Sequence, residues 1–282
     1  MSHHPTAIID SSAALGESVE VGPFAVIGAG AQIGDQTLLG AHVSIGDGTV
    51  IGSQCRLHTG AILGGPPQHR SHPEHRSGVR IGDRNEFREY VTIHGATDPE
   101  GGTVIGDDNY LMAYSHAGHD VHIGNGVTIA NMVQLGGHVI VEDGVVIGGI
   151  LGVHQFVRIG KFAMVGGLSR VTQDIPPFML TEGAPARVMG LNRHGMRRAG
   201  LDADTQQAIK QAYRLIYRSK LNLGEALEQV RRTLPMSDAL QYLIDFLSRL
   251  QNGHAGRQND PMGVPVAVRE AQPAGVPSRR GE

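Results

Sequence analysis

Several residue types that most proteins use freely are scarce in this chain. Of its 282 residues none is tryptophan, only 4% are aromatic, and Cys55 is the single cysteine. One cysteine excludes a framework of internal disulfides and fits a reducing compartment. The formal net charge of −3 gives no indication of general nucleic-acid binding. No apolar run approaches the roughly 20 residues that span a bilayer, and the N-terminus lacks a signal-peptide core, so we expect a soluble, cytoplasmic protein.

Glycine and aliphatic residues take the place of the missing aromatics. The chain has 40 glycines, and 40% of its residues are hydrophobic. An aliphatic residue recurs at every sixth position from Ile9 to Leu63, and the same spacing returns from Ile105 to Val171. Glycine follows at most of these positions, and a small or β-branched residue comes four positions after each aliphatic. The sequence is therefore an internal repeat of hexapeptides.

A period of six residues fits neither an α-helix nor a simple alternating strand. It fits a parallel β-helix, in which each hexad forms one short strand and a tight turn. Three hexads close one triangular coil, so residues 18 apart stack at the inter-strand spacing of about 4.8 Å. The aliphatic residue points inward, the small residue fills the corner, and glycine relieves the turn. We therefore predict a mainly β protein, with this solenoid over residues 1–190.

Two segments interrupt the repeat. Residues 65–78 and 95–103 carry proline, glycine and charged residues without the six-residue spacing. We expect both to be loops that leave the solenoid, where binding groups are often found.

The spacing becomes helical after Pro176 and Pro177. Three helices are predicted, over residues 202–218, 223–233 and 237–250, and Asp202 has the character of an N-cap for the first. We assign residues 191–251 to a C-terminal α-helical domain. Residues 252–282 are rich in glycine, proline, glutamine and arginine, which predicts a disordered tail.

The stretch YSHAGHDVHIGN, residues 114–125, has three histidines at intervals of three. This spacing could indicate a metal site, an acid–base site or a polar surface. The hexapeptide period, however, places His116 and His122 on different faces of the triangle. The three imidazoles cannot meet at one ion within a single chain, so we expect no metal site from this stretch.

The 18-residue coil groups a different set of histidines. His119, His138 and His154 follow inward-facing residues of three consecutive coils, so they are expected on one edge, beside the glycine pair Gly136-Gly137. Solvated surface histidines are the simpler alternative. A neutral imidazole near pH 7 can accept a proton from a hydroxyl or amine nucleophile, and Asp120 could fix its tautomer.

The same edge offers a group for an oxyanion. A backbone N–H at Gly137 could stabilise a tetrahedral intermediate, so the residues favour acyl transfer by direct attack of the acceptor. No covalent acyl-enzyme is expected, because Cys55 falls on an inward corner position and the chain has no serine elbow.

The motifs HAGHDVHIGN, LGGH, VHQFVRIG, MVGGLSRVTQDIPPF and AYRLIYRS resemble the UDP-N-acetylglucosamine O-acyltransferases of lipid A biosynthesis. The resemblance covers roughly residues 5–250. It implies a left-handed β-helix, a homotrimer with active sites in the clefts between subunits, and transfer of a 3-hydroxyacyl chain from acyl carrier protein to the 3-position of the UDP-sugar. It implies no cofactor and no metal.

The resemblance also assigns roles to residues. It makes His119 the general base, Asp120 its orienting partner and Gly137 the oxyanion donor. Gly167 matches the position that helps to set acyl-chain length, and as glycine it would leave room for a longer chain. The residues implied in substrate binding are Gln68, His116, His138, His154, Gln155, Asn192 and Arg198.

The sugar-binding loop departs from the family pattern. After PPQ the family usually has an acidic residue and, two places later, a lysine, whereas Gln68 is followed in this sequence by HRSH. The family's IHRGT is IHGAT at residues 93–97, and the second arginine of its RRG is Ala199. A 3-amino sugar as acceptor is therefore kept as an alternative.

Other classes share parts of this pattern. A γ-class carbonic anhydrase uses the same prism with zinc at a trimer interface, but the helical C-terminus, the VHQF motif and the His119-Asp120 pair argue against it. A non-catalytic scaffold and the related N-acyltransferase of the same pathway are further alternatives.

Overall fold

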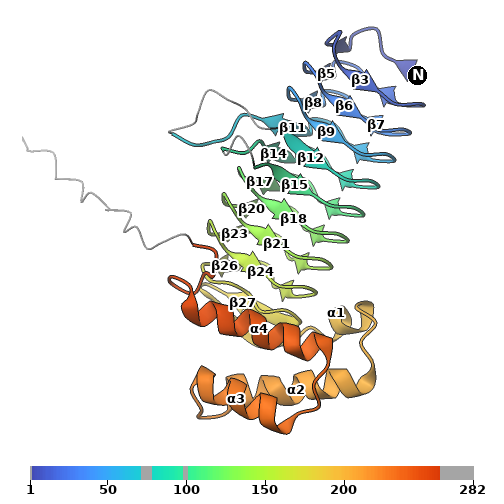
Figure 1. Cartoon of the computed structure of the whole chain (residues 1–282). Helices are drawn as coiled ribbons and strands as arrows, with labels where there is room; N and C mark the ends of the chain where they lie inside the picture. The colour runs from blue at the N-terminus through green and yellow to red at the C-terminus, as the bar shows by residue number, and fades with distance from the viewer. Residues whose placement is uncertain (1, 71–77, 98–100, 261–282) are drawn as a thin grey trace, which may run out of the picture.

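The computed structural model describes residues 2–70, 78–97 and 101–260. In these residues, 26 short strands from β1 (Ser2–His3) to β26 (Arg170–Val171) wind into a solenoid with three faces, each a parallel sheet. The N-terminus lies at one end of the solenoid and the helices lie at the other (Figure 1). The predicted parallel β-helix of hexapeptide repeats with a C-terminal helical region is confirmed.

Up to β26, each of the three sheets takes every third strand of the chain. In spatial order, the first sheet contains β1 (Ser2–His3), β4 (Glu20–Val21), β7 (Leu38–Leu39), β10 (Arg56–Leu57), β13 (Glu86–Phe87), β16 (Tyr110–Leu111), β19 (Thr128–Ile129), β22 (Val146–Ile147), β25 (Met164–Val165), β27 (Met179–Gly183) and β28 (Ala186–Leu191). The second sheet contains β2 (Ile8–Ile9), β5 (Val26–Ile27), β8 (Ser44–Ile45), β11 (Ile62–Gly65), β14 (Thr92–His94), β17 (His116–Ala117), β20 (Val133–Leu135), β23 (Leu151–Val153) and β26 (Arg170–Val171). The third sheet contains β3 (Ala14–Leu15), β6 (Gln32–Ile33), β9 (Val50–Ile51), β12 (Val79–Ile81), β15 (Thr103–Ile105), β18 (His122–Ile123), β21 (Ile140–Val141) and β24 (Arg158–Ile159).

The core is built from the two positions that the hexapeptide pattern predicts. The recurring aliphatic residues from Val21 to Val171 are buried, as are the small residues at the corners. Ala117, Leu135 and Val153 pair in register on neighbouring strands of the second sheet, so residues 18 apart do stack. Each coil is thus one layer of a narrow aliphatic core, which leaves almost no room for aromatic side chains.

The turns between strands use the left-handed backbone region. Asp120 and His138 occupy equivalent turns of consecutive coils, between the second and third sheets, with φ of 59° and 58°. Such φ values are uncommon for residues other than glycine and are often found at functional sites. Both side chains therefore project from a fixed corner of the solenoid.

The two predicted interruptions appear as changes in strand register. Val50 pairs with Arg80, 30 positions further along the chain, and Arg80 pairs with Val104, 24 positions further. Two coils therefore contain extra residues beyond the regular 18. Of the predicted loops, residues 71–77 and 98–100 lie outside the described residues.

A hairpin and four helices follow the last coil. β27 pairs antiparallel with β28, an element that the repeat did not predict, and it leads into the short helix α1 (Arg193–Arg198). The three predicted helices are α2 (Ala203–Arg218), α3 (Leu223–Thr233) and α4 (Asp238–Asn252). Asp202 caps α2, since its carboxylate accepts the backbone N–H of Thr205 at 2.7 Å.

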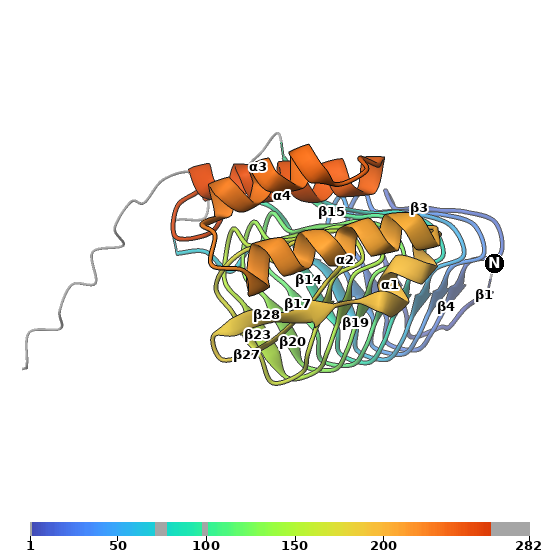
Figure 2. The same ribbon diagram turned by 90° about the horizontal axis from the view of Figure 1, so that it is seen from below.

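The helices have a hydrophobic core of their own, which includes Ile209, Val230 and Leu243. Phe178 and Met179 of the solenoid end contribute to it, and the helices lie across the end of the solenoid (Figure 2). Within the described residues, no helix is both long and apolar enough to cross a bilayer.

The start of the predicted disordered tail has a defined structure. The backbone N–H of Asp174 donates to Gly256, and the Asp174 carboxylate accepts the backbone N–H of Gln258 at 2.8 Å. Arg257 donates to the carbonyl of Thr172. Residues 253–260 therefore differ from the prediction, because buried Asp174 provides partners that the composition of the tail does not indicate. The remaining residues of the tail, 261–282, lie outside the described residues.

Candidate active site

His119 and Asp120 form a hydrogen-bonded pair at the corner between β17 and β18. Nδ1 of His119 lies 2.7 Å from Oδ2 of Asp120, and both side chains are largely buried. An Nδ1–H that donates to the carboxylate leaves Nε2 as the unprotonated nitrogen. The pair therefore has the arrangement of a general base and its orienting carboxylate.

Two threonines hold Asp120 in place. Thr97 donates its hydroxyl to Oδ2 at 2.7 Å, and its backbone N–H lies 3.2 Å from both carboxylate oxygens. The backbone N–H of Asp120 donates to Oγ1 of Thr103 at 3.0 Å. Burial raises the pKa of Asp120, but the hydrogen bonds from His119 and Thr97 outweigh it and leave this pKa below its ordinary value. Asp120 is thus held as a carboxylate.

Gly137 lies against the imidazole of His119. A Cβ atom at Gly137 would come within 2.5 Å of Cε1 and 2.6 Å of Nε2 of His119. Within the described residues, the backbone N–H of Gly137 donates to no protein acceptor. A free N–H beside the basic nitrogen is what an oxyanion site requires.

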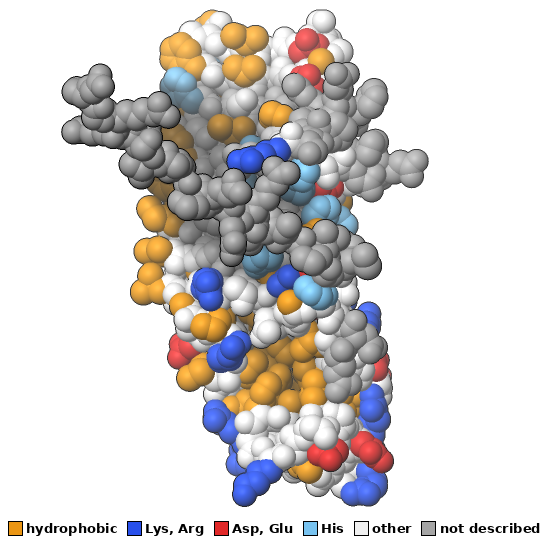
Figure 3. Space-filling model, turned by 90° about the vertical axis from the view of Figure 1, so that its left-hand side faces the viewer, with side chains coloured by type: hydrophobic (Ala, Val, Ile, Leu, Met, Phe, Trp, Pro, Cys, Tyr) orange, Lys and Arg blue, Asp and Glu red, His pale blue; other side chains and the backbone are white. Residues whose placement is uncertain are grey.

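A pocket over the second sheet contains most of the predicted site residues. Its lining includes His119, Gly137, Gln68, His116, His154 and Gln155. Histidine side chains gather on this side of the solenoid (Figure 3). The loop after β11 contributes Gln68 and His69 to the lining. The carbonyl of Pro66 in this loop lies 2.6 Å from Nδ1 of His94 on β14. Residues of consecutive coils and residues of the loop thus line one cavity.

His138 and His116 flank this pair differently. The His138 ring is edge-on to His119, with ring centroids 5.1 Å apart, and stacks on Phe156. Burial lowers the pKa of His138. Burial, together with the nearby His94, lowers the pKa of His116 to about 4, and Nδ1 of His116 bonds to Oγ1 of Thr92 at 2.8 Å. His116 is therefore neutral at physiological pH.

Three residues of the site escaped the sequence prediction. Thr97 and Thr103 belong to the interrupted segment 95–103, which the sequence showed only as a loop. His69 lines the pocket, and its ring is edge-on to His119 with centroids 5.3 Å apart. Its place directly after Gln68 could have indicated that His69 belongs to the site. The hexapeptide repeat, however, does not predict the position of a residue in a loop.

Three predicted residues lie away from this pocket in the single chain. Asn192 caps α1: its Oδ1 accepts the N–H of Gly195 and its Nδ2 donates to Phe162. Arg198 donates to the carbonyl of Gly144 at 2.8 Å, at the corner between the third and first sheets. Gly167 is exposed at the turn after β25. Their predicted roles stay predictions.

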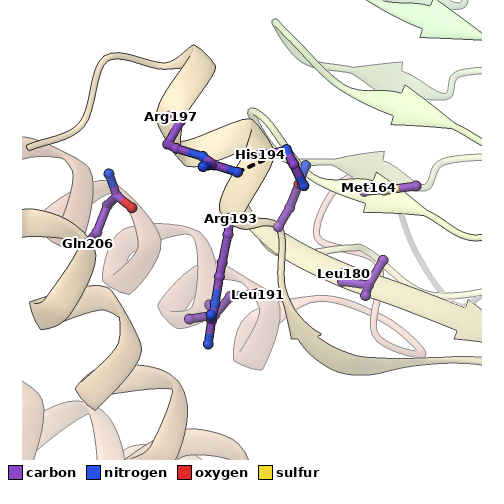
Figure 4. Close-up of a pocket in the computed structure, with 8 residues that line it drawn as sticks. Met164, Leu180, Leu191, Arg193, His194, Arg197 and Gln206 are labelled. Atoms are coloured by element: carbon purple, nitrogen blue, oxygen red, sulfur yellow. Dashed lines mark hydrogen bonds between the residues drawn. The ribbon is translucent and has the colours of Figure 1, made fainter. Parts of the chain in front are cut away.

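A second cavity lies beside α1, on the face of the first sheet. Asn192 lines it together with Met164, Arg193, His194 and Arg197. Figure 4 shows Arg197 and His194 joined by a hydrogen bond of 3.0 Å. This cavity has a basic character and no residue in common with the pocket at His119.

The three histidines of the 114–125 stretch do not lie on one face of the solenoid. His116 lies on the second sheet and His122 on the third, as the period predicted. A different group, His119, Asp120 and His138, offers ligand atoms that all lie within 4.8 Å of one another. Two imidazoles and one carboxylate are chemically suited to zinc, and Nδ1 of His119 and Oδ2 of Asp120 are hydrogen-bonded to each other in this group.

The chain is similar to known transferases over the segment that carries His119 and Asp120. Residues 102–137 match the bacterial transferase hexapeptide family, and residues 174–255 match the family described as UDP N-acetylglucosamine O-acyltransferase, domain 2. The solenoid and these two family matches define a hexapeptide-repeat acyltransferase.

Relatives that align over nearly their whole length identify the family more narrowly. The acyl-[acyl-carrier-protein]–UDP-N-acetylglucosamine O-acyltransferase of Paraburkholderia phymatum is 49% identical over 89% of this chain and 97% of its own length. That of Anaeromyxobacter dehalogenans is 48% identical over 90% and 99%. The solved UDP-N-acetylglucosamine O-acyltransferase of Moraxella catarrhalis is 40% identical, with a TM-score of 0.83 over 88% of this chain and 97% of that one. This chain belongs to the family of UDP-N-acetylglucosamine O-acyltransferases.

Proposed function

We propose that this enzyme transfers a 3-hydroxyacyl chain from acyl carrier protein to the 3-hydroxyl of UDP-N-acetylglucosamine, the first step of lipid A biosynthesis. The relatives are named for this donor and this acceptor. The single observation that carries the chemistry is the 2.7 Å contact between Nδ1 of His119 and Oδ2 of Asp120 beside the N–H of Gly137. A single cysteine in 282 residues fits a reducing compartment, which supports a cytoplasmic location.

The first step is deprotonation of the acceptor. Nε2 of His119 takes the proton of the sugar hydroxyl as its oxygen attacks the thioester carbonyl carbon. Asp120 keeps the proton on Nδ1 and stabilises the imidazolium that forms. The lowered pKa of Asp120 supports this role, because a carboxylate stabilises the imidazolium by its negative charge and a neutral carboxyl would not.

The second step is collapse of the tetrahedral intermediate. The N–H of Gly137 holds the oxyanion, and the carbon–sulfur bond then breaks. The imidazolium of His119 returns its proton to the departing thiolate of the carrier arm. Neither step needs a metal or an organic cofactor, so we expect full activity after treatment with a chelator.

An apolar edge of the solenoid supports assembly into a homotrimer. The turns between the first and second sheets carry exposed apolar or aromatic side chains, namely Phe24, Tyr90, Tyr114, Met132, Ile150 and Leu168. Tyr90 and Tyr114 stack, with ring centroids 5.2 Å apart. From Tyr90 to Leu168 every such turn carries one of these side chains, and an exposed apolar strip of this kind is typical of a protein–protein interface.

The same arrangement would complete the active site. If three copies meet at this apolar edge, the second sheet of one copy faces the first sheet of the next. The basic cavity at Asn192 lies on that first sheet, and Arg198 lies on its far corner. We propose that Asn192 and Arg198 of the neighbouring copy bind the nucleotide in this cleft, and that exposed arginines of α1 and α2 attract the acidic carrier protein.

Product analysis tests the function, and sedimentation tests the assembly. Mass spectrometry of reactions with several acyl carrier protein thioesters should show an acylated product with UDP-N-acetylglucosamine. Product formed only with the 3-amino analogue would support the amide-forming alternative, and no product with either would refute the proposal. Sedimentation should give a trimer, and the Ile150→Asp substitution should shift it toward the monomer.

A further inference from the structure

The floor of the active-site pocket is a column of outward-facing residues on the second sheet. His116, Gln134, Gly152 and Arg170 pair in register on β17, β20, β23 and β26. All four line the pocket that contains His119. The column therefore runs from the catalytic coil toward the helical end of the solenoid.

Gly152 leaves a gap in this column. A Cβ atom at position 152 would have nothing within 4 Å, and the φ angle of Gly152 is not in the left-handed region. Neither packing nor backbone conformation therefore requires glycine at this position. A larger residue would fit the fold and would project into the pocket. Glycine at position 152 therefore affects the space in the pocket and not the packing of the solenoid.

Arg170 ends the column with an unpaired charge. Its side chain is exposed, and in the described part of the chain it makes no hydrogen bond or ion pair. By contrast, Arg158 is bound to Glu142 and Arg84 to Asp108. The described residues that line the pocket include no aspartate or glutamate. This end of the pocket is therefore suited to an anionic group.

The distance of Arg170 from His119 indicates which of the two substrates can bring a phosphate to Arg170. Arg170 is three strands away from the coil of His119, which is about 14 Å at the inter-strand spacing. The diphosphate of a UDP-sugar is attached to the ring that carries the acceptor hydroxyl, so it stays much closer to His119. The arm of a carrier protein has its thioester at one end and a phosphate at the other, separated by a long flexible chain.

We propose that Gly152 and Arg170 determine binding of the acyl donor: the carrier arm lies over Gly152, and Arg170 binds its phosphate. This inference rests on the proposed function, and it adds the path and the anchor of the donor. Gly152 provides the space and Arg170 provides the charge. Neither residue takes part in the proton transfer at His119.

The test compares two small donors, an acyl-4′-phosphopantetheine and the corresponding acyl-pantetheine without phosphate. The wild type should have a KM about tenfold lower for the phosphorylated donor, as a charge-assisted contact would give. Arg170→Ala should abolish this preference, Arg170→Lys should restore part of it, and the KM for UDP-N-acetylglucosamine should not change. Gly152→Leu should raise the KM of both donors while the pH profile of kcat stays that of the wild type.

The controls separate this inference from the proposed function. Arg80→Ala removes an exposed arginine from the third sheet and should leave the donor preference intact. The thermal unfolding midpoint shows whether each variant is folded, and Gly152→Ala replaces Gly152→Leu if the latter is not. A wild type that forms no product refutes the function itself. An active wild type without a phosphate preference, or an Arg170→Ala variant that raises only the KM of the UDP-sugar, overturns the inference.

Discussion

Nδ1 of His119 lies 2.7 Å from Oδ2 of Asp120, although the two residues are adjacent in the chain and their backbones turn a corner of the solenoid. In this protein the left-handed backbone of Asp120 bends the chain back, and Thr97 fixes the carboxylate from another coil. The corner therefore prepares the base before any substrate binds.

Asp120→Asn should reduce kcat with little effect on either KM. The neutral amide cannot stabilise the imidazolium as a carboxylate does. It also no longer fixes the tautomer of His119 that carries its proton on Nδ1. We expect a loss of roughly 100-fold to 10,000-fold, the range of general acid–base catalysis. Steady-state kinetics measures it, and a kcat close to that of the wild type would show that Asp120 has only a structural role.

Gly137→Ala should inactivate the enzyme without unfolding it. The new methyl group would lie 2.5 Å from Cε1 of His119, so the imidazole must move away from the pocket. We expect kcat to fall by about 100-fold or more, since both the base and the oxyanion donor are disturbed. Gly190→Ala, at a position in β28 with open space and outside the lining of the pocket at His119, is the matched control. Equal activities of the two variants would contradict the assigned role of Gly137.

Glu142→Gln should weaken the attachment of the helical region. The buried Glu142 carboxylate accepts hydrogen bonds from Nε of Arg158 at 2.6 Å, from the N–H of Lys161 and from the hydroxyl of Tyr242 on α4. Loss of this charge leaves Arg158 without its ion-pair partner, and we expect the free energy of unfolding to fall by about 2 kcal/mol. Urea unfolding measures it, with exposed Glu228→Gln as the control. An unchanged free energy would show that this cluster does not hold α4.

His116 should make the fold sensitive to mild acid. Its pKa is lowered from 6.5 to about 4 in the folded protein, first by burial and then by His94. The unfolded chain therefore binds more protons between these values, and the contribution of neutral His116 is complete above pH 6.5 and is lost as the pH falls toward 4. His116→Gln should lose less of its thermal unfolding midpoint than the wild type between pH 7.5 and pH 5. His42→Gln, which changes an exposed histidine, should behave like the wild type, and equal losses in all three proteins would exclude His116 as the cause.

The sequence predicted what the six-residue period controls. It placed His119, Gly137 and His154 around one pocket, because a fixed coil converts sequence separation into spatial position. Gln155, which also lines the pocket, followed from the family resemblance. It could not place His69 or Thr97, since both follow β-strands into segments of irregular length. The register across those segments jumps by 30 and 24 residues, which no repeat reveals.

Two further features were beyond the period for other reasons. Residues 253–260 are ordered by contacts with Asp174, a buried partner some 80 positions away that composition does not indicate. The predicted roles of Asn192 and Arg198 could not be located within a single coil, because in one copy both residues lie away from the pocket at His119.

The most direct test of the account is the rate of acyl transfer by His119→Ala. With saturating acyl carrier protein thioester and UDP-N-acetylglucosamine, kcat should fall by at least about 100-fold. Equilibrium binding of UDP-N-acetylglucosamine and the thermal unfolding midpoint should stay near those of the wild type. A folded His119→Ala variant that keeps the wild-type kcat would contradict the assignment of His119 as the general base.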